Sequence, residues 1–302
     1  FTNCGATGKT GPTLANCKSS YDTSWEDDTD FFNVQTQGIQ EWTVPTTATY
    51  TIEVWGAAGG TQLYSSDYAG GYGAKMQGDF DLTQGEVIKI IAGQKGEDTR
   101  ATNQDNAAPG GGGGSFVWKS SSSTLLIAAG GGGGGGRSSH SGIHANSSTS
   151  GNAANGLSNG GSSGNGGTSN TNGSSYWAGG GAGWSNDGTG GNQSTNYTYS
   201  PGSRGAYGGR KPLNGGTGGT RYNDGNDEGG DGGFGGGGGG GSDNMGTGGG
   251  GGYSGGGGNN GSSPYNATGG GGGSYNGGSN TTNTAGSSTE WSDHGKVTIT
   301  VN

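Results

Sequence analysis

The sequence predicts an all-β protein, an antiparallel β-sandwich with an inserted bundle of polyglycine II helices. Apolar residues alternate with polar ones at a period of two in the first part of the chain and again at its end. No segment shows the apolar stripe of an amphipathic helix. Glycine accounts for 82 of the 302 residues, and much of it stands in uninterrupted runs. The first two observations indicate strands, and the third indicates a segment that cannot fold by burying side chains.

Strands are expected wherever the alternation is clear. Within residues 38–58, Tyr50, Ile52 and Val54 alternate with polar neighbours, which is typical of a strand with one buried face. Further strands are expected at Ala74–Leu82, Glu86–Ala92, Ser115–Lys119, Leu125–Ala129 and Gly295–Val301.

The last expected strand stands far from the others in the sequence, so the chain must leave the sheet and return to it. We therefore expect one integrated module. Residues 1–129 form a sandwich with an N-terminal disulfide loop, which residues 295–302 complete, and residues 130–294 form a glycine-rich insertion.

The glycine runs are similar in length and lie at Gly110–Gly114, Gly130–Gly136, Gly235–Gly241, Gly248–Gly252, Gly255–Gly258 and Gly269–Gly273. In polyglycine II geometry a run of five to seven residues spans ~15–22 Å. Packed side by side, such helices satisfy the backbone N–H and C=O groups of one another. Aromatic residues such as Trp177, Trp184 and Tyr253 favour this arrangement over the alternative, a flexible linker, because disordered segments are poor in aromatics.

Composition excludes several classes of function. The formal net charge is −9, and an acidic chain repels a phosphate backbone, so we expect no nucleic-acid partner. No stretch approaches the ~20 apolar residues of a membrane span. The chain begins with Phe1 rather than Met, and we expect a processed product or an excised fragment.

The two cysteines, Cys4 and Cys17, are expected to form one disulfide that closes a small loop. The alternative is a pair of free thiols in a cytosolic protein. A disulfide favours an oxidising compartment outside the cytosol.

Several segments resemble one known family. FTNCGATGKTGPTLANC, GIQEWTVPTTATYTIEVWGAAGG, GEVIKIIAGQKGED and GGFGGGGGGGSDNMGTGGGGGYSGG occur in this order. Together they resemble the extracellular glycine-rich module of the anaplastic lymphoma kinase and leukocyte tyrosine kinase receptors, over nearly the whole chain. The resemblance implies a jelly-roll sandwich like that of tumour necrosis factor, combined with polyglycine II helices, outside the cell and without catalysis. The chain departs from the family in having no cysteine after Cys17, and a receptor-kinase role is not carried over.

Catalytic and metal-binding motifs are weak. Gly160–Gly164 and Gly252–Gly256 both fit G-x-S-x-G, but neither follows a strand and opens a helix. His140 and His144 lie in a loop-like stretch, and the acidic segment 224–231 lacks the glutamate that closes a calcium loop. We expect no enzyme, no cofactor and no metal site.

Seven Asn-x-Ser/Thr sequons lie in the glycine-rich half. In a protein secreted from a eukaryotic cell they are candidate N-glycosylation sites, although a segment so rich in Asn, Ser and Thr also produces sequons by chance. They are Asn146, Asn172, Asn192, Asn196, Asn260, Asn266 and Asn280.

From these observations we expect a secreted, non-enzymatic structural protein, a self-assembling subunit of an extracellular fibre, matrix or surface coat. The alternatives are the ligand-binding ectodomain of a cell-surface receptor and a glycan-binding adhesin. The expected partners are copies of the chain or an extracellular protein ligand, with covalent glycans as a candidate modification.

Overall fold

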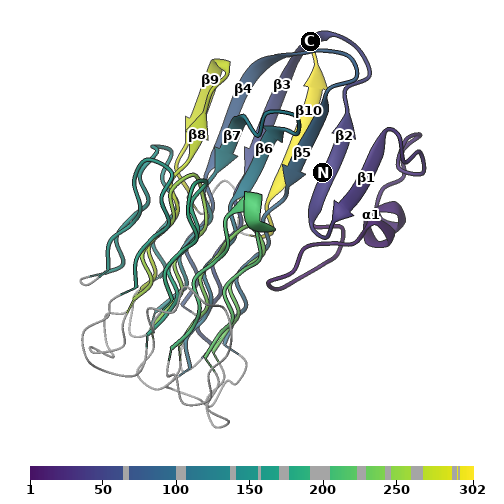
Figure 1. Cartoon of the computed structure of the whole chain (residues 1–302). Helices are drawn as coiled ribbons and strands as arrows, with labels where there is room; N and C mark the ends of the chain where they lie inside the picture. The colour runs from purple at the N-terminus through teal and green to yellow at the C-terminus, as the bar shows by residue number, and fades with distance from the viewer. Residues whose placement is uncertain are drawn as a thin grey trace.

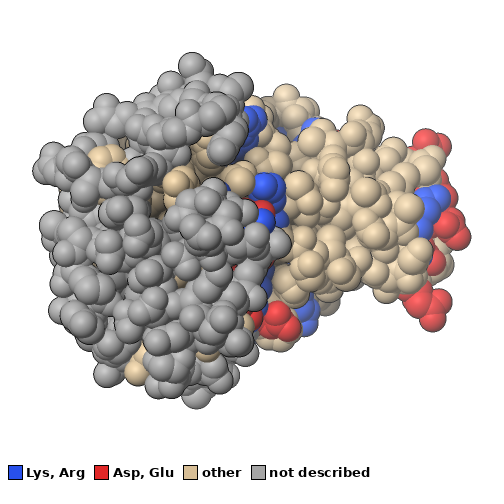
Figure 2. All heavy atoms as spheres, turned by 90° about the horizontal axis from the view of Figure 1, so that it is seen from below, with Lys and Arg blue, Asp and Glu red and all other residues tan. Residues whose placement is uncertain are grey.

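The structure is a computed structural model, and it describes residues 1–63, 68–99, 107–136, 141–155, 158–169, 177–190, 205–222, 229–241, 246–259, 268–287, 291 and 293–302. A β-sandwich lies at one end, and extended glycine-rich segments run side by side from its base toward the other end (Figure 1). Acidic side chains gather at the end of the molecule that α1 and β1 occupy, as Figure 2 shows.

Two antiparallel sheets form the sandwich, and the predicted fold class is confirmed. The six-stranded sheet has the order β1 (Phe32–Thr36), β2 (Ile39–Thr43), β5 (Val87–Ile91), β6 (Ser115–Lys119), β7 (Leu125–Ala129) and β8 (Tyr275–Asn276). The four-stranded sheet has the order β10 (Lys296–Val301), β3 (Ala48–Trp55), β4 (Lys75–Leu82) and β9 (Ser279–Thr284). Every strand expected from the alternation is present.

The main core lies between the two sheets. Tyr50, Ile52 and Val54 of β3 are buried, and the residues between them are half-buried, as the alternation predicts. They pack in one cluster with side chains of the facing sheet, including Ile88 and Ile90 of β5. Burial of these side chains removes apolar surface from water, which is the main force that holds the sheets together.

A short helix, α1 (Leu14–Ser20), stands beside β1 and was not expected. The Oγ1 of Thr13 accepts the N–H of Asn16 at 3.2 Å, and the Oδ1 of Asn16 accepts the N–H of Thr13 at 2.9 Å. This reciprocal cap needs only two polar side chains, so the helix forms without an apolar stripe. A disulfide joins Cys4 to Cys17 and ties the helix to the N-terminal loop.

Two strands come from within residues 130–294. β8 pairs with β7 in one sheet, and β9 pairs with β4 in the other. In the opposite direction, residues before position 129 leave the sandwich: segments 56–60 and 107–114 bond to glycine-rich segments. Both regions of the sequence therefore contribute segments to the sandwich and to the glycine-rich part.

We call the glycine-rich segments outside the strands the glycine array. Their backbones bond directly to one another, and the described members are 56–60, 69–74, 92–97, 107–114, 130–135, 141–146, 151–155, 158–169, 177–190, 205–210, 217–222, 229–241, 246–259 and 268–273. Phe234 anchors the array to the sandwich, because its fully buried ring packs with Ile91 and Phe116.

Hydrogen bonds in the glycine array repeat at an interval of three residues. Gly131 donates to the oxygen of Gly251 at 2.7 Å and Gly134 to that of Gly248 at 2.9 Å, whereas the two residues between them donate to two other segments. The same interval separates Gly111 from Gly114, Gly179 from Ala182 and Gly249 from Gly252, each pair facing one neighbour. A polyglycine II helix would produce this interval. The helix assignment itself stays a prediction.

Side chains have no room inside the array, which explains the glycine runs. A Cβ added at Gly250 would lie 2.1 Å from the oxygen of Gly131, and one added at Gly131 would lie 2.4 Å from the oxygen of Gly112. Both distances are far below van der Waals contact. The backbones approach closely enough to bond only because these residues are glycine.

Candidate functional site

A groove on the outer side of the glycine array is the candidate site. It lies between segments 205–210 and 217–222, which bond to each other in antiparallel fashion. Tyr207 donates its N–H to the oxygen of Thr220 at 2.9 Å, and Arg210 donates to that of Thr217 at 2.8 Å. Gly215, whose φ is 91°, lies in the turn that reverses the chain between the two segments.

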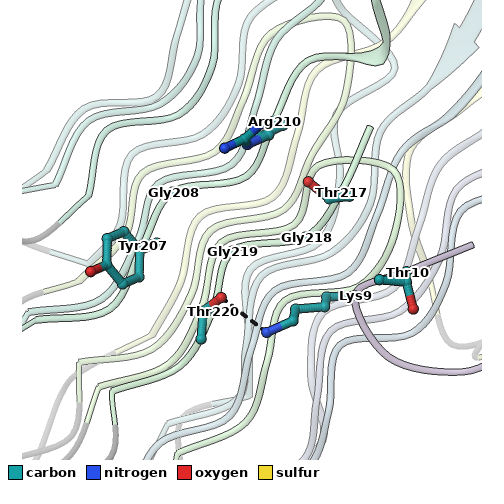
Figure 3. A pocket seen from close by; sticks show the side chains of 9 residues that line it. All are labelled: Lys9, Thr10, Tyr207, Gly208, Arg210, Thr217, Gly218, Gly219 and Thr220. Atoms are coloured by element: carbon teal, nitrogen blue, oxygen red, sulfur yellow. Dashed lines mark hydrogen bonds between the residues drawn. The ribbon is translucent and has the colours of Figure 1, made fainter. Parts of the chain in front are cut away.

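The three-residue interval builds the groove. Tyr207 and Arg210 are three residues apart, as are Thr217 and Thr220, and all four side chains line the cavity (Figure 3). The glycines between them have no side chain, so they leave the floor as bare backbone. The groove is thus a cavity of about 280 Å³ between two rows of side chains, and Lys9 and Thr10 from the N-terminal loop close it.

A buried carboxylate holds Lys9 in place at the groove. The Nζ of Lys9 lies 3.3 Å from the Oδ2 of Asp231 and donates to the Oγ1 of Thr220 at 3.0 Å. The side chain of Asp231 is 8% exposed, and its Oδ1 accepts the N–H of Arg221 at 2.7 Å. A buried carboxylate needs such partners, and the ammonium of Lys9 is one of them.

The chemistry of the groove is that of binding. Its side chains are two cations, one phenol ring and three threonine hydroxyls, those of Lys9, Arg210, Tyr207, Thr10, Thr217 and Thr220. Such a mixture can hold a polar ligand by hydrogen bonds and ring contact. Neither a histidine nor a cysteine lines this cavity in the described part of the chain.

Ser254 and His144 belong to the candidate catalytic and metal-binding motifs of the sequence, and in the structure both make packing and hydrogen-bond contacts within the fold. Ser254, at the centre of one G-x-S-x-G match, is fully buried, and its Oγ accepts the N–H of Gly164 at 3.1 Å. His144 stacks on Tyr72, and its Nδ1 accepts the N–H of Tyr72 at 3.0 Å. His140 and residues 224–228 of the acidic segment lie outside the described residues.

Two of the candidate glycosylation sites are described. Asn280 lies on the exposed strand β9, and its Nδ2 donates to the Oδ2 of Asp79 at 2.9 Å. Asn146 is half-buried, and its Nδ2 donates to the Oδ1 of Asn152 at 2.9 Å. The other five fall outside the described residues: Asn172, Asn192, Asn196, Asn260 and Asn266.

Sequence reasoning missed the groove residues, although a signal was present. Tyr207-Gly-Gly-Arg210 and Thr217-Gly-Gly-Thr220 repeat the pattern of two glycines between two side chains. In a backbone with a three-residue interval, this pattern places both side chains on one face. Nothing in the sequence indicated that Lys9 would join them.

Among the described residues, no group of three or more His, Cys, Asp or Glu side chains is placed to hold a metal ion. A helix long and apolar enough to cross a membrane is likewise absent from that part of the chain.

Comparison with known proteins finds a partial similarity to a receptor. No protein-family model matches the chain. A stretch of 98 residues is 36% identical to the leukocyte tyrosine kinase receptor of Mus musculus, and it covers 32% of this chain and 11% of the receptor. The chain thus spans about a tenth of the length of this relative. A similarity to a receptor of the expected family is thus found over about a third of the chain, and its location in the extracellular glycine-rich module stays a prediction.

Proposed function

We propose that this chain is a non-enzymatic extracellular binding module, which presents the groove of Lys9, Tyr207 and Arg210 on a rigid glycine array. The observation that carries the proposal is the groove itself. Its side chains stand at fixed intervals on a floor of bonded backbone, so a ligand would meet a preorganised surface. Preorganisation lowers the entropy lost on binding.

Two further observations support an extracellular binding role. The Cys4–Cys17 disulfide suits an oxidising compartment. The partial similarity to a receptor suits a module that captures a ligand. The three-residue interval supports the polyglycine II assignment and, with it, a stiff array. In this proposal the sandwich and the array act as one integrated module.

A selection experiment tests the groove. Peptides displayed on phage would be selected on the full chain and then measured on two variants. Tyr207→Gly removes the ring but keeps a residue that suits the array. Leu213→Ala changes a side chain that is 47% exposed and does not line the groove. The proposal expects selected peptides that lose at least tenfold in affinity on Tyr207→Gly and keep it on Leu213→Ala. Selected peptides that bind all three proteins equally would contradict it.

The second candidate function is the self-assembling subunit of an extracellular fibre, matrix or coat. The uneven distribution of charge favours it, because acidic side chains gather at one end of the molecule (Figure 2). Negative-stain electron microscopy over a concentration series separates the two candidates. Filaments of constant width would support assembly. Dispersed particles at every concentration would contradict assembly and favour the binding module.

A further inference from the structure

A cluster of aromatic rings and ammonium groups lies at the base of the four-stranded sheet. Lys296 of β10, Trp55 of β3 and Lys75 of β4 stand directly beside one another in the strand register. The Nζ of Lys296 lies 4.9 Å from the centre of the Trp55 ring, and the Nζ of Lys75 lies 5.1 Å from the same centre. The ring of Trp291 lies 5.9 Å from the Nζ of Lys296. We call Trp55, Lys75, Trp291 and Lys296 the Lys296 patch.

The two ammonium groups of the patch have one carboxylate partner among the described residues. Lys75 lies 3.5 Å from Glu53. Lys296 has no carboxylate within 4 Å among the described residues, and its contacts are the two tryptophan rings. Both ammoniums touch one ring, so they lie within about 10 Å of each other, where like charges repel. A carboxylate from outside would relieve this repulsion.

The patch also has the make-up of an interface centre. Tryptophan is enriched among the residues that dominate binding energy, and a cation on its ring face adds a favourable contact. All four side chains are half-buried, so much of their conformational freedom is already lost before a partner binds. A partner for this patch should therefore carry exposed carboxylates.

The chain carries such a partner segment itself. The loop between α1 and β1 holds five acidic residues, and we call residues 22–30 the acidic loop. Asp22, Asp27, Asp28 and Asp30 are exposed. Within the described structure this loop forms one ion pair with a basic side chain: the Nζ of Lys18 lies 3.5 Å from the Oδ1 of Asp27. Trp25 holds the loop against the molecule, because its ring lies 5.3 Å from that of Phe32.

We infer that the Lys296 patch of one copy docks the acidic loop of a second copy. The inference rests on the second candidate function. The two surfaces differ from each other, so each copy that joins leaves one patch and one loop open. A contact of this kind propagates into a ring or a filament. A contact between four patch residues and one loop is expected to be weak and sensitive to salt.

Charge reversal tests the contact in the full-length chain. Lys296→Glu makes the patch acidic, and the double variant Asp27→Lys/Asp28→Lys makes the loop basic. Each variant alone would lack a matching pair. An equimolar mixture would restore two: the acidic patch of the first variant faces the basic loop of the second, and the unchanged patch of the second faces the unchanged loop of the first. Lys211→Glu is the matched control, because the Nζ of Lys211 donates to the oxygen of Ser185, away from the patch.

Sedimentation velocity over a concentration series at low and high salt gives the readout. We expect the unchanged chain and Lys211→Glu to associate at low salt, each reversed variant to associate at least tenfold more weakly, and the mixture to recover. Recovery cannot arise from misfolded variants. If the reversed variants associate as strongly as the unchanged chain, the proposed contact is wrong, although self-assembly is still supported. If the unchanged chain stays monomeric throughout, both the contact and the assembly function are overturned.

Discussion

Lys95 donates its backbone N–H to the Nδ1 of His294 at 3.0 Å, across 199 residues of sequence. The bond ties the turn after β5 to the segment that enters β10. Only the neutral imidazole can accept it, because protonated Nδ1 is a donor.

This bond predicts a loss of stability in mild acid. Burial, with a smaller contribution from the charge of Lys95, lowers the pKa of His294 below its ordinary value of 6.5, and Asp293 opposes the shift. The unfolded chain then binds the proton first, so stability present above about pH 6.5 is lost as the pH falls toward the folded pKa. Urea-unfolding midpoints should drop between pH 7 and pH 5, and drop less in His294→Gln. Equal drops in both proteins would contradict the assignment.

A methyl group inside the array should destabilise the fold. In Gly250→Ala the new Cβ would lie 2.1 Å from a backbone oxygen, so a bonded segment must move. The expected loss in free energy of unfolding is about 3 kcal/mol. Gly190→Ala is the matched control, because its Cβ would meet its nearest atom at 3.4 Å. Urea denaturation compares the two, and equal stability would show that the array can relax around a side chain.

Removal of the disulfide should loosen the N-terminal region. Cys4→Ser/Cys17→Ser opens a loop with a sequence separation of 13, and the chain-entropy account expects a loss of about 3 kcal/mol. The cysteines pack on Phe32, near Trp25, so tryptophan fluorescence should report the change. An unchanged unfolding midpoint after reduction would mean that the aromatic cluster holds this region without the disulfide.

Glycan attachment should differ between the two described sequons. Asn280 is exposed on β9, where a glycan can extend into solvent, whereas Asn146 is half-buried in the glycine array. Protein secreted from a eukaryotic host should carry a glycan at Asn280 and little or none at Asn146. Peptide mass spectrometry measures both sites, with Thr282→Ala as the control that removes the first sequon. A fully occupied Asn146 in folded protein would contradict this expectation.

The strands that alternation predicted are those with one buried face, such as β3 and β10, because burial of every second side chain leaves a readable pattern. β9 has no apolar residue and no buried one, and it forms by pairing with β4 at the edge of the sheet. Its existence depends on a neighbour distant in sequence. The helix α1 depends on a local cap, which the search for apolar stripes does not detect.

The groove was harder to predict than the sandwich. Its two rows follow from the three-residue interval, which the glycine content alone does not establish. Lys9 reaches the groove because Asp231, far along the chain, holds it there. Pairings of this kind arise from tertiary packing and have no local sequence pattern.

Because of the three-residue interval, some positions of the array face neighbouring backbones and others face outward. Inward glycines such as Gly131 and Gly250 are closed to variation, because a Cβ there would strike a neighbouring backbone. Outward positions such as Tyr207, Arg210, Thr217 and Thr220 line the groove, and in the proposed binding role they would contact the ligand while the backbone bonds stay as they are. A lineage of such proteins could therefore acquire new binding preferences by changing a handful of outward residues while its architecture stayed the same.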